Sequence, residues 1–253
     1  MLGLGIDVFR YGGVGGTPFE VTNSLIFTAA SSQYGLQTFG TPTDATKWTL
    51  STWLKIDSTG ASKMIFTAGE NTGSYDYIMV NATGAILVYD GFGGGTRGYV
   101  YTGNVVTSTD TWYHLCVKFD GSAASSSRVV VYLDGVAQSL TVSTAWPSGG
   151  GYINTAFPHG LGVRYRPPST YDGYHNGHLC ETFFVDGQSL TPSSFYDSGS
   201  PIAYTGTFGN NGFYLDYKDG TSTTTLGYDV SGNDNHWTLS NMTTANQSTD
   251  VPA

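Results

Sequence analysis

The chain has 253 residues, a length that suits one large all-β domain or two small ones. Its 35 glycines, 18 tyrosines and only 11% charged residues are typical of a turn-rich β protein and argue against long helices. The net charge of -9, with 10 Lys and Arg spread thinly along the chain, leaves no basic patch for phosphates. We therefore expect no nucleic-acid partner.

The first 23 residues are glycine-rich and lack a clear period, which predicts an N-terminal arm over residues 1–23 that needs a partner surface to become ordered. The start "MLGLGIDVFRYGGVGG" has neither a basic beginning nor the apolar run of a secretory signal. No segment reaches the ~20 apolar residues that a membrane span needs. We expect a chain without a leader and without membrane contact.

From Ser24 onward, short apolar runs such as "WTLSTWLKI", "YDYIMV" and "AILVYD" alternate with turn signals, which favours a β-sandwich or barrel. The clearest alternation lies in residues 111–140, where two runs each place every second residue on one face. The inward residues are Tyr113, Leu115, Val117 and Phe119 in the first run and Val129, Val131 and Leu133 in the second. Together these patterns predict a packed sandwich core.

Two kinds of residue have an expected structural role. Cys116 and Cys180 lie in strand-like runs, which favours two buried free thiols over a disulfide. Six aspartates precede a glycine, a pair that suits a hairpin turn, and much of the acidity is interpreted as turn chemistry. They are Asp90, Asp120, Asp134, Asp172, Asp186 and Asp219.

The longest irregular region, residues 143–176, contains the candidate binding residues. Aromatic side chains there could stack on sugar rings or fill pockets at a protein interface, and arginines beside them could form interfacial ion pairs. We favour a protein interface. The candidates are Trp146, Tyr152, Arg164, Tyr165, Arg166, Tyr171 and Tyr174.

The stretch "DVSGNDNHWTL" is the candidate metal loop. An EF-hand would need Gly at its sixth position and Glu at its twelfth, where this chain has Asp234 and Ser240, so that reading fails. Two interpretations remain. The loop is either a calcium site formed by Asp229, Asn233 and Asn235 or a turn held by hydrogen bonds from side chains to the backbone. We expect "HWTL" to follow in a hairpin as a late strand. We expect no cofactor unless this loop binds calcium.

The strands resemble a known family. The phrases "SLIFTAASSQYGLQT", "WTLSTWLKI", "TWYHLCVKFDG", "RVVVYLDGVAQ" and "GHLCETFFVDGQSLTPSSF" are similar to laminin-G-like domains of the concanavalin A-like superfamily, over roughly residues 24–198. The resemblance implies an all-β, concanavalin A-like (laminin-G-like) jelly-roll sandwich of about twelve to fourteen strands. We place this domain at residues 24–253, with a C-terminal extension from about residue 210 and a short helix after Thr191.

A second resemblance concerns the two ends of the chain. The start "MLGLG" and the tail from "NNGFYLDYKDG" to "STDVP" are similar to structural proteins of tailed, notably marine, bacteriophages. This implies a virion component, made in the host cytoplasm, that decorates a head or forms a fibre or spike. The expected partners are capsid or tail proteins and further copies of the chain, with host glycans contacted through the loops.

Catalysis is not expected. A retaining glycoside hydrolase needs two carboxyls about 5 Å apart, and the chain has only three Glu residues, Glu20, Glu70 and Glu181, with no paired motif around them. No Gly-x-Ser-x-Gly motif is present either. The alternative to a non-enzymatic virion protein is a carbohydrate-binding lectin module, and after it a glycan-degrading tail enzyme.

Overall fold

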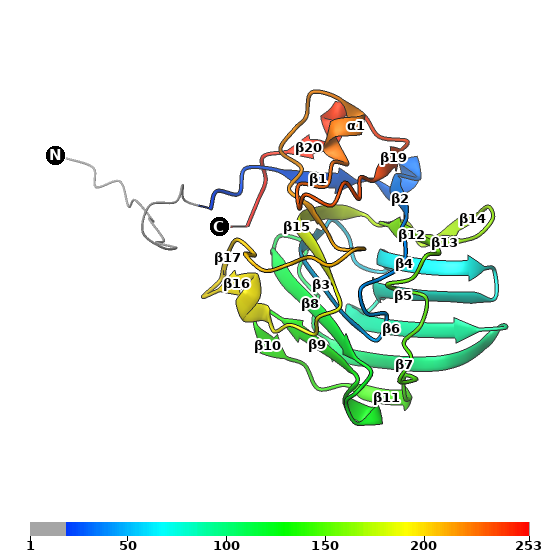
Figure 1. The fold of residues 1–253 in the computed structure, drawn as a ribbon. Helices are drawn as coiled ribbons and strands as arrows, with labels where there is room; N and C mark the ends of the chain where they lie inside the picture. Colours follow the sequence, from blue (N-terminus) through cyan, green and yellow to red (C-terminus); the bar gives the residue numbers. More distant parts are fainter. Residues whose placement is uncertain (1–18, 253) are drawn as a thin grey trace.

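Two eight-stranded antiparallel sheets pack face to face in the computed structural model, which describes residues 19–252 (Figure 1). This confirms the expected all-β sandwich. Most of the proposed N-terminal arm, residues 1–18, lies outside the described residues. The regular β-structure starts at Ser24, where the sequence pattern placed it.

The first sheet has β15 at its centre, flanked by partners from both halves of the chain. In spatial order its strands are β10 (Val136–Ala137), β9 (Val129–Leu133), β8 (Tyr113–Asp120), β3 (Lys47–Ile56), β15 (Gly177–Asp186), β1 (Ser24–Phe27) and β20 (Gln247–Ser248), and β18 (Phe213–Leu215) also pairs with β15.

The second sheet contains a meander of four consecutive strands, which lie side by side (Figure 1). Its order is β11 (Thr141–Thr144), β7 (Gly95–Asn104), β6 (Ala85–Phe92), β5 (Ser74–Val80), β4 (Lys63–Asn71), β12 (Pro158–Leu161), β2 (Tyr34–Thr38) and β19 (Thr238–Ser240). Two short hairpins lie outside these sheets: β13 (Arg164–Arg166) pairs with β14 (Thr170–Asp172), and β16 (Tyr196–Asp197) pairs with β17 (Ser200–Pro201). The described residues therefore form more strands than the twelve to fourteen expected.

Helical structure is minor. The short helix expected after Thr191 is a single 3-10 turn, η3 (Pro192–Ser194), and the Thr191 side chain makes no capping hydrogen bond. The other helical segments are η1 (Ala29–Ser31), η2 (Ser125–Ser127), α1 (Thr223–Leu226) and η4 (Thr244–Asn246). None of the helices in residues 19–252 is long and apolar enough to cross a membrane.

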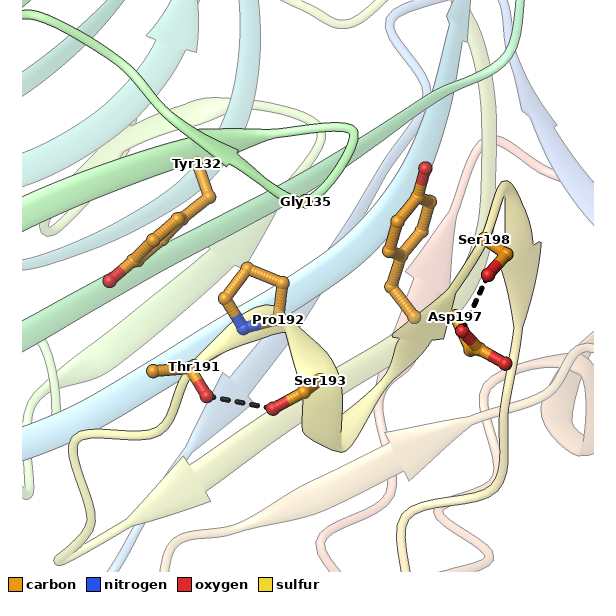
Figure 2. Close-up of a pocket in the computed structure, with 8 residues that line it drawn as sticks. Tyr132, Gly135, Thr191, Pro192, Ser193, Asp197 and Ser198 are labelled. Atoms are coloured by element: carbon orange, nitrogen blue, oxygen red, sulfur yellow. Dashed lines mark hydrogen bonds between the residues drawn. The ribbon is translucent and has the colours of Figure 1, made fainter.

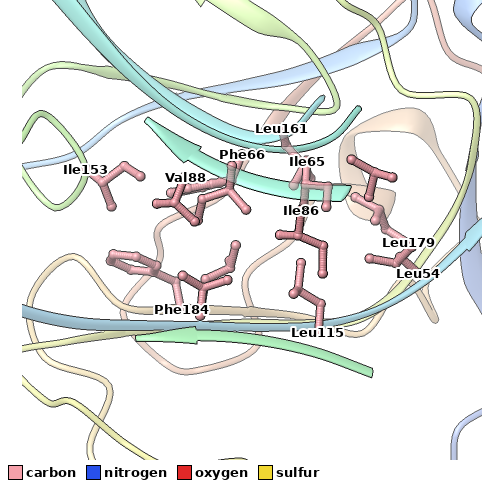
Figure 3. Close-up of a cluster of buried hydrophobic side chains, with 14 of the residues drawn as sticks. Leu54, Ile65, Phe66, Ile86, Val88, Leu115, Ile153, Leu161, Leu179 and Phe184 are labelled. Carbon is pink, nitrogen blue, oxygen red and sulfur yellow. The ribbon is translucent and has the colours of Figure 1, made fainter. Parts of the chain in front are cut away.

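The core fills the space between the sheets (Figure 3). All seven predicted inward residues of β8 and β9 belong to it, and Leu115, Val117 and Phe119 are fully buried. Phe66 of the second sheet faces Phe184 of the first, with ring centroids 5.5 Å apart. Each such side chain contributes roughly 1.5–3 kcal/mol through removal from water.

A β-bulge in β15 allows this strand to change partners. Before the bulge, Leu179 pairs with β1; after it, Thr182 pairs with β18. Glu181 lies at the bulge with φ +48, a left-handed conformation, and the register against β3 shifts between Cys180 and Phe183. The extra residue bends the strand, so that segments from the N- and C-terminal regions both extend the sheet.

The C-terminal segment completes both sheets. The expected late strand is β19, but it pairs with β2 at the edge of the second sheet instead of forming a hairpin with a neighbouring segment. Strand β20 pairs with β1, with Ser24 opposite Ser248. The Ser24 hydroxyl also donates to the carbonyl of Asp250 at 2.6 Å, so the first and last strands lie together.

Both cysteines are free and buried, as predicted, and burial raises the pKa of Cys116 to about 12. The interpretation of the Asp-Gly pairs was wrong in part. Of the six, only Asp134 and Gly135 both have positive φ, the geometry of a tight hairpin turn. Asp90 and Asp186 are fully buried and accept hydrogen bonds inside the fold.

Candidate functional site

Five tyrosines gather on the outer face of the second sheet, and we call this surface the tyrosine face. Their sequence neighbours Ile78, Val88 and Val100 point into the core, so alternation along β5, β6 and β7 turns the tyrosines outward. The five are Tyr75, Tyr77, Tyr89, Tyr99 and Tyr101. They were not among the residues selected from the sequence.

Strand register places three of these tyrosines in one row. Tyr77 lies directly opposite Tyr89, which lies directly opposite Tyr99 on the next strand. The rings of Tyr77 and Tyr89 stack with centroids 4.8 Å apart at 14°, and Tyr99 meets Tyr89 edge-on at 6.0 Å. The row is thus a continuous aromatic strip across three neighbouring strands.

A glycine gives one ring of the strip its position. A Cβ on Gly91 would lie 2.7 Å from the Tyr89 ring, closer than carbon atoms approach, so the ring can lie along the strand only because this residue has no side chain. Tyr77 is 9% exposed and the other four tyrosines are half-buried. Burial raises the pKa of Tyr77 and Tyr99, so their hydroxyls stay neutral and can both donate and accept hydrogen bonds.

The β13–β14 hairpin brings two arginines over this surface. Arg164 lies over the Tyr77 ring at 5.9 Å and Arg166 over the Tyr75 ring at 5.4 Å, both in cation-π range. Asp172 binds both guanidinium groups, Nε of Arg164 and Nη2 of Arg166, each at 2.5 Å. Burial acts to raise the pKa of Asp172, but the hydrogen bonds and charges of the two arginines outweigh it and lower that pKa.

The opposite face of the hairpin anchors it to the body of the protein. Tyr165 is buried and stacks on Tyr171 at 4.8 Å, and Tyr171 contacts Tyr34 at 4.9 Å. Tyr174 lies 6.3 Å from the same Tyr34 ring. The Thr67 hydroxyl donates to the carbonyl of Val163 at 3.1 Å and so ties the start of the hairpin to β4. Two of the predicted binding residues, Arg164 and Arg166, thus reach the tyrosine face. The predicted tyrosines of this region instead hold the hairpin in place: Tyr165, Tyr171 and Tyr174.

The two remaining aromatic candidates are core residues, and their prediction as surface residues was wrong. Trp146 is 1% exposed and packs on Trp48 and Phe119. Tyr152 is 6% exposed, and its backbone N–H donates to the Asp76 carboxylate. Both come from an irregular segment that turns back into one end of the sandwich, where large rings fill space between the sheets.

One pair of carboxyl groups lies on neighbouring strands, Asp76 opposite Asp90, but both point into the sandwich and are fully buried. Arg97 binds Asp90 through two hydrogen bonds of 2.7 and 2.8 Å. Burial first, and then the charge of Asp90, raise the pKa of Asp76 well above its usual value. A substrate on the outer face could not reach this pair.

Glu181 is the other strongly perturbed acid. The Tyr214 hydroxyl donates to its Oε2, and Oε1 has no hydrogen-bond partner among the described residues. Burial raises the pKa of Glu181 to about 8. Its position at the β-bulge of the first sheet puts it on the other sheet from the tyrosine face. The charge of Asp216 adds to the rise in its pKa, and the side chain itself is enclosed in the fold.

The candidate calcium loop has the hydrogen bonds of a turn. Asp229 accepts from the backbone N–H groups of Tyr214, Ser231 and Asn235 at 2.8 to 2.9 Å and from the Ser231 hydroxyl. The side-chain amides of Asn233 and Asn235 donate to backbone carbonyls. No three His, Cys, Asp or Glu residues within 19–252 are grouped to hold a metal ion. The contacts match the turn interpretation, and the calcium site stays a prediction.

A surface pocket of about 370 Å³ lies elsewhere, between the β9–β10 hairpin and η3. Figure 2 shows Tyr132 and Pro192 among its lining residues and the hydrogen bonds of Thr191 with Ser193 and of Ser198 with Asp197. Tyr196 also lines it, but its ring is stacked on His114 at 5.0 Å. Two tyrosines line the pocket, whereas five gather on the tyrosine face, which is therefore the stronger candidate.

The comparison with known families agrees with this architecture. A family model described as the Concanavalin A-like lectin/glucanases superfamily, of laminin G type, matches residues 29–182. The chain belongs to this superfamily. No curated protein matches it in sequence.

The chain is similar to several solved structures at low identity. A protein from Bacteroides ovatus, named as a candidate carbohydrate-binding protein, is 18% identical with a TM-score of 0.59, and the match covers 93% of this chain and 62% of that one. The pentraxin of Limulus polyphemus is 14% identical over 68% of this chain and 78% of its own, with a TM-score of 0.49. Mouse laminin alpha1 domains LG4-5 are 12% identical over 67% and 44%, with a TM-score of 0.46.

None of these three is named as a bacteriophage protein, so the virion location and virion partners expected from the ends of the chain stay predictions. The first structure is also longer than this chain, which spans 62% of it. At such identities the likeness shows the fold alone, and the function has to be argued from the surface itself.

Proposed function

We propose that the protein is a non-enzymatic carbohydrate-binding module and that it binds glycans on the tyrosine face. The observation behind the proposal is the row Tyr77, Tyr89 and Tyr99, which runs unbroken across three strands on an outer face. A sugar ring has an apolar face that stacks on an aromatic ring and hydroxyls that bond to nearby donors and acceptors. Half-buried tyrosines supply both.

The rigidity of this surface also favours binding. The rings are held by strands and by each other, with Tyr75 also 5.8 Å from Tyr89, so little side-chain entropy is lost when a ligand arrives. This function is compatible with membership of a lectin and glucanase superfamily. It is also compatible with the likeness to a protein named for carbohydrate binding.

Binding without hydrolysis is supported by the carboxyl groups. The paired Asp76 and Asp90 are enclosed between the sheets, and Glu181 is enclosed in the other sheet. A glycosidase needs an acid and a base on either side of an accessible bond. The resemblance of the chain's ends to phage structural proteins would place such a module on a virion that contacts host glycans, a setting that rests on the sequence alone.

The test is binding to a glycan array followed by calorimetry with the best ligand. Tyr89→Ala removes the central ring and should weaken binding at least tenfold, about 1.4 kcal/mol. Tyr228→Ala is the matched control, because Tyr228 is an exposed tyrosine (39%) outside the tyrosine face. Equal affinity of the Tyr89→Ala variant and the unmodified protein would refute the assignment of this face.

A further inference from the structure

The edge of the tyrosine face has an excess of positive charge. In the β13–β14 hairpin, Arg164 lies directly opposite Asp172, and Arg166 lies two residues further on the same side. Two guanidinium groups therefore share one carboxylate, in a chain whose net charge is -9. The aromatic surface below is neutral, so one positive charge at this edge has no partner among residues 19–252.

Both guanidinium groups also keep unused hydrogen-bond donors. A guanidinium has five N–H groups, and Asp172 accepts one from each arginine. The Nε of Arg166 is buried and has no hydrogen-bond partner within the described residues. Cation-π contacts with Tyr77 and Tyr75 help to hold the two side chains in place. A second oxyanion could thus bind without rearrangement of the arginines.

The two arginines lie over Tyr77 and Tyr75, at the border of the surface where a glycan would lie. Arg164 and Arg166 are 29% and 21% exposed, so water and ligands reach them, yet both are partly desolvated. An ion pair in such surroundings is stronger than one in open water. Guanidinium groups match the planar oxygens of carboxylates and the oxygens of sulfate or phosphate groups better than they match hydroxyls.

Building on the proposed function, we propose that the glycan bound by the tyrosine face is acidic and that Arg164 and Arg166 bind its anionic group. The anionic group is a uronate carboxylate or a sulfate ester, which present the same oxygens to a guanidinium. The sugar ring that carries it stacks beside Tyr75 and Tyr77, and the remainder of the chain continues along the tyrosine row.

The experiment uses an array of matched oligosaccharides: uronate-containing chains with their carboxyl-reduced forms, and sulfated chains with their desulfated forms. The protein should bind an acidic member at least tenfold more tightly than its neutral match, and 0.5 M NaCl should reduce the difference. The uronate and sulfate series tell the two sources of the anionic group apart.

Three variants locate the effect. Arg166→Gln should lower affinity for the acidic glycan about tenfold and leave the neutral match unchanged, whereas Asp172→Asn, which removes the competing carboxylate, should raise affinity for the acidic glycan. Lys118→Gln is the matched control, since it removes one positive charge from β8 of the first sheet. Circular dichroism and melting temperature verify that each variant is folded.

The outcomes separate the two proposals. If neutral and acidic matches bind equally and Tyr89→Ala weakens both, the tyrosine face binds glycans but the acidic class is wrong. If no glycan on the array binds above the Tyr89→Ala background, both proposals are overturned. If Arg166→Gln lowers affinity for neutral and acidic matches alike, the arginine does not recognise the charge and this inference fails.

Discussion

Glu181 is a buried carboxylic acid whose proton the fold retains, and this makes stability depend on pH. In the unfolded chain the group titrates near 4.5, whereas burial raises its pKa to about 8 in the folded protein. Between these values only the unfolded state releases the proton. The contribution of Glu181 to stability is therefore most favourable at low pH, becomes less favourable as pH rises from 4.5 to about 8, and then levels off. At pH 7 the cost to folding is about 3 kcal/mol, since each pH unit is worth about 1.36 kcal/mol.

Glu181→Gln removes this titration while it keeps an oxygen that can accept the Tyr214 hydroxyl. The new amide N–H would be buried without an assigned partner, which costs about 1 kcal/mol at every pH. We therefore expect the variant to be about 1 kcal/mol less stable than the unmodified protein at pH 4.5 and about 2 kcal/mol more stable at pH 7. The two stabilities should cross near pH 5 to 6, as each pH unit contributes about 1.4 kcal/mol.

Urea unfolding followed by tryptophan fluorescence at pH 4.5 to 8.5 measures this difference. Glu20→Gln is the control, because Glu20 is exposed, and its stability should run parallel to that of the unmodified protein. The reasoning is wrong if the difference between Glu181→Gln and the unmodified protein stays constant over this range. A constant difference would mean that the folded protein does not hold the proton.

Other consequences follow from residues with well-defined surroundings. Burial lowers the pKa of three histidines, His114, His159 and His175, to about 3. Each should therefore cost about 1.4 kcal/mol of stability per pH unit below 6.5, which melting temperatures measured from pH 7 to 4 would show. A shallow decline would mean that these histidines are charged in the folded protein. Asp186→Ala leaves three backbone N–H groups and the Asn154 amide without their acceptor and should cost at least about 3 kcal/mol in thermal unfolding. A loss below about 1 kcal/mol would contradict its anchoring role. Gly91→Ala should displace the neighbouring tyrosine ring and weaken glycan binding severalfold with little loss of stability, and unchanged affinity would argue against a fixed ring position.

The sandwich itself could be predicted because alternation reports burial directly. In β8, each inward residue from Tyr113 to Phe119 is separated by one residue, and the structure buries all of them between the sheets. The family motifs depend on the same residues. The alternation of apolar residues carries no information on which distant segments pair. The partner of β19 and the bulge at Glu181 could therefore not be predicted from it.

The candidate site was predicted less well, and for a physical reason. Aromatic residues in a long irregular segment suggest an exposed surface, yet Trp146 and Tyr152 fill the end of the core. In the sequence, the residues of the tyrosine face are only single tyrosines in separate predicted strands. Its continuity depends on the register that sets Tyr77 opposite Tyr89, and register is a tertiary property.

The pairing of β1 with β20 places the first and last strands of the described residues side by side, with Ser24 opposite Ser248. A domain whose first and last strands are neighbours can be joined to another protein at one edge, because the two connections need to lie only about a strand spacing apart. Such a connection would lie on the first sheet and would leave the tyrosine face, on the outer side of the second sheet, open to solvent.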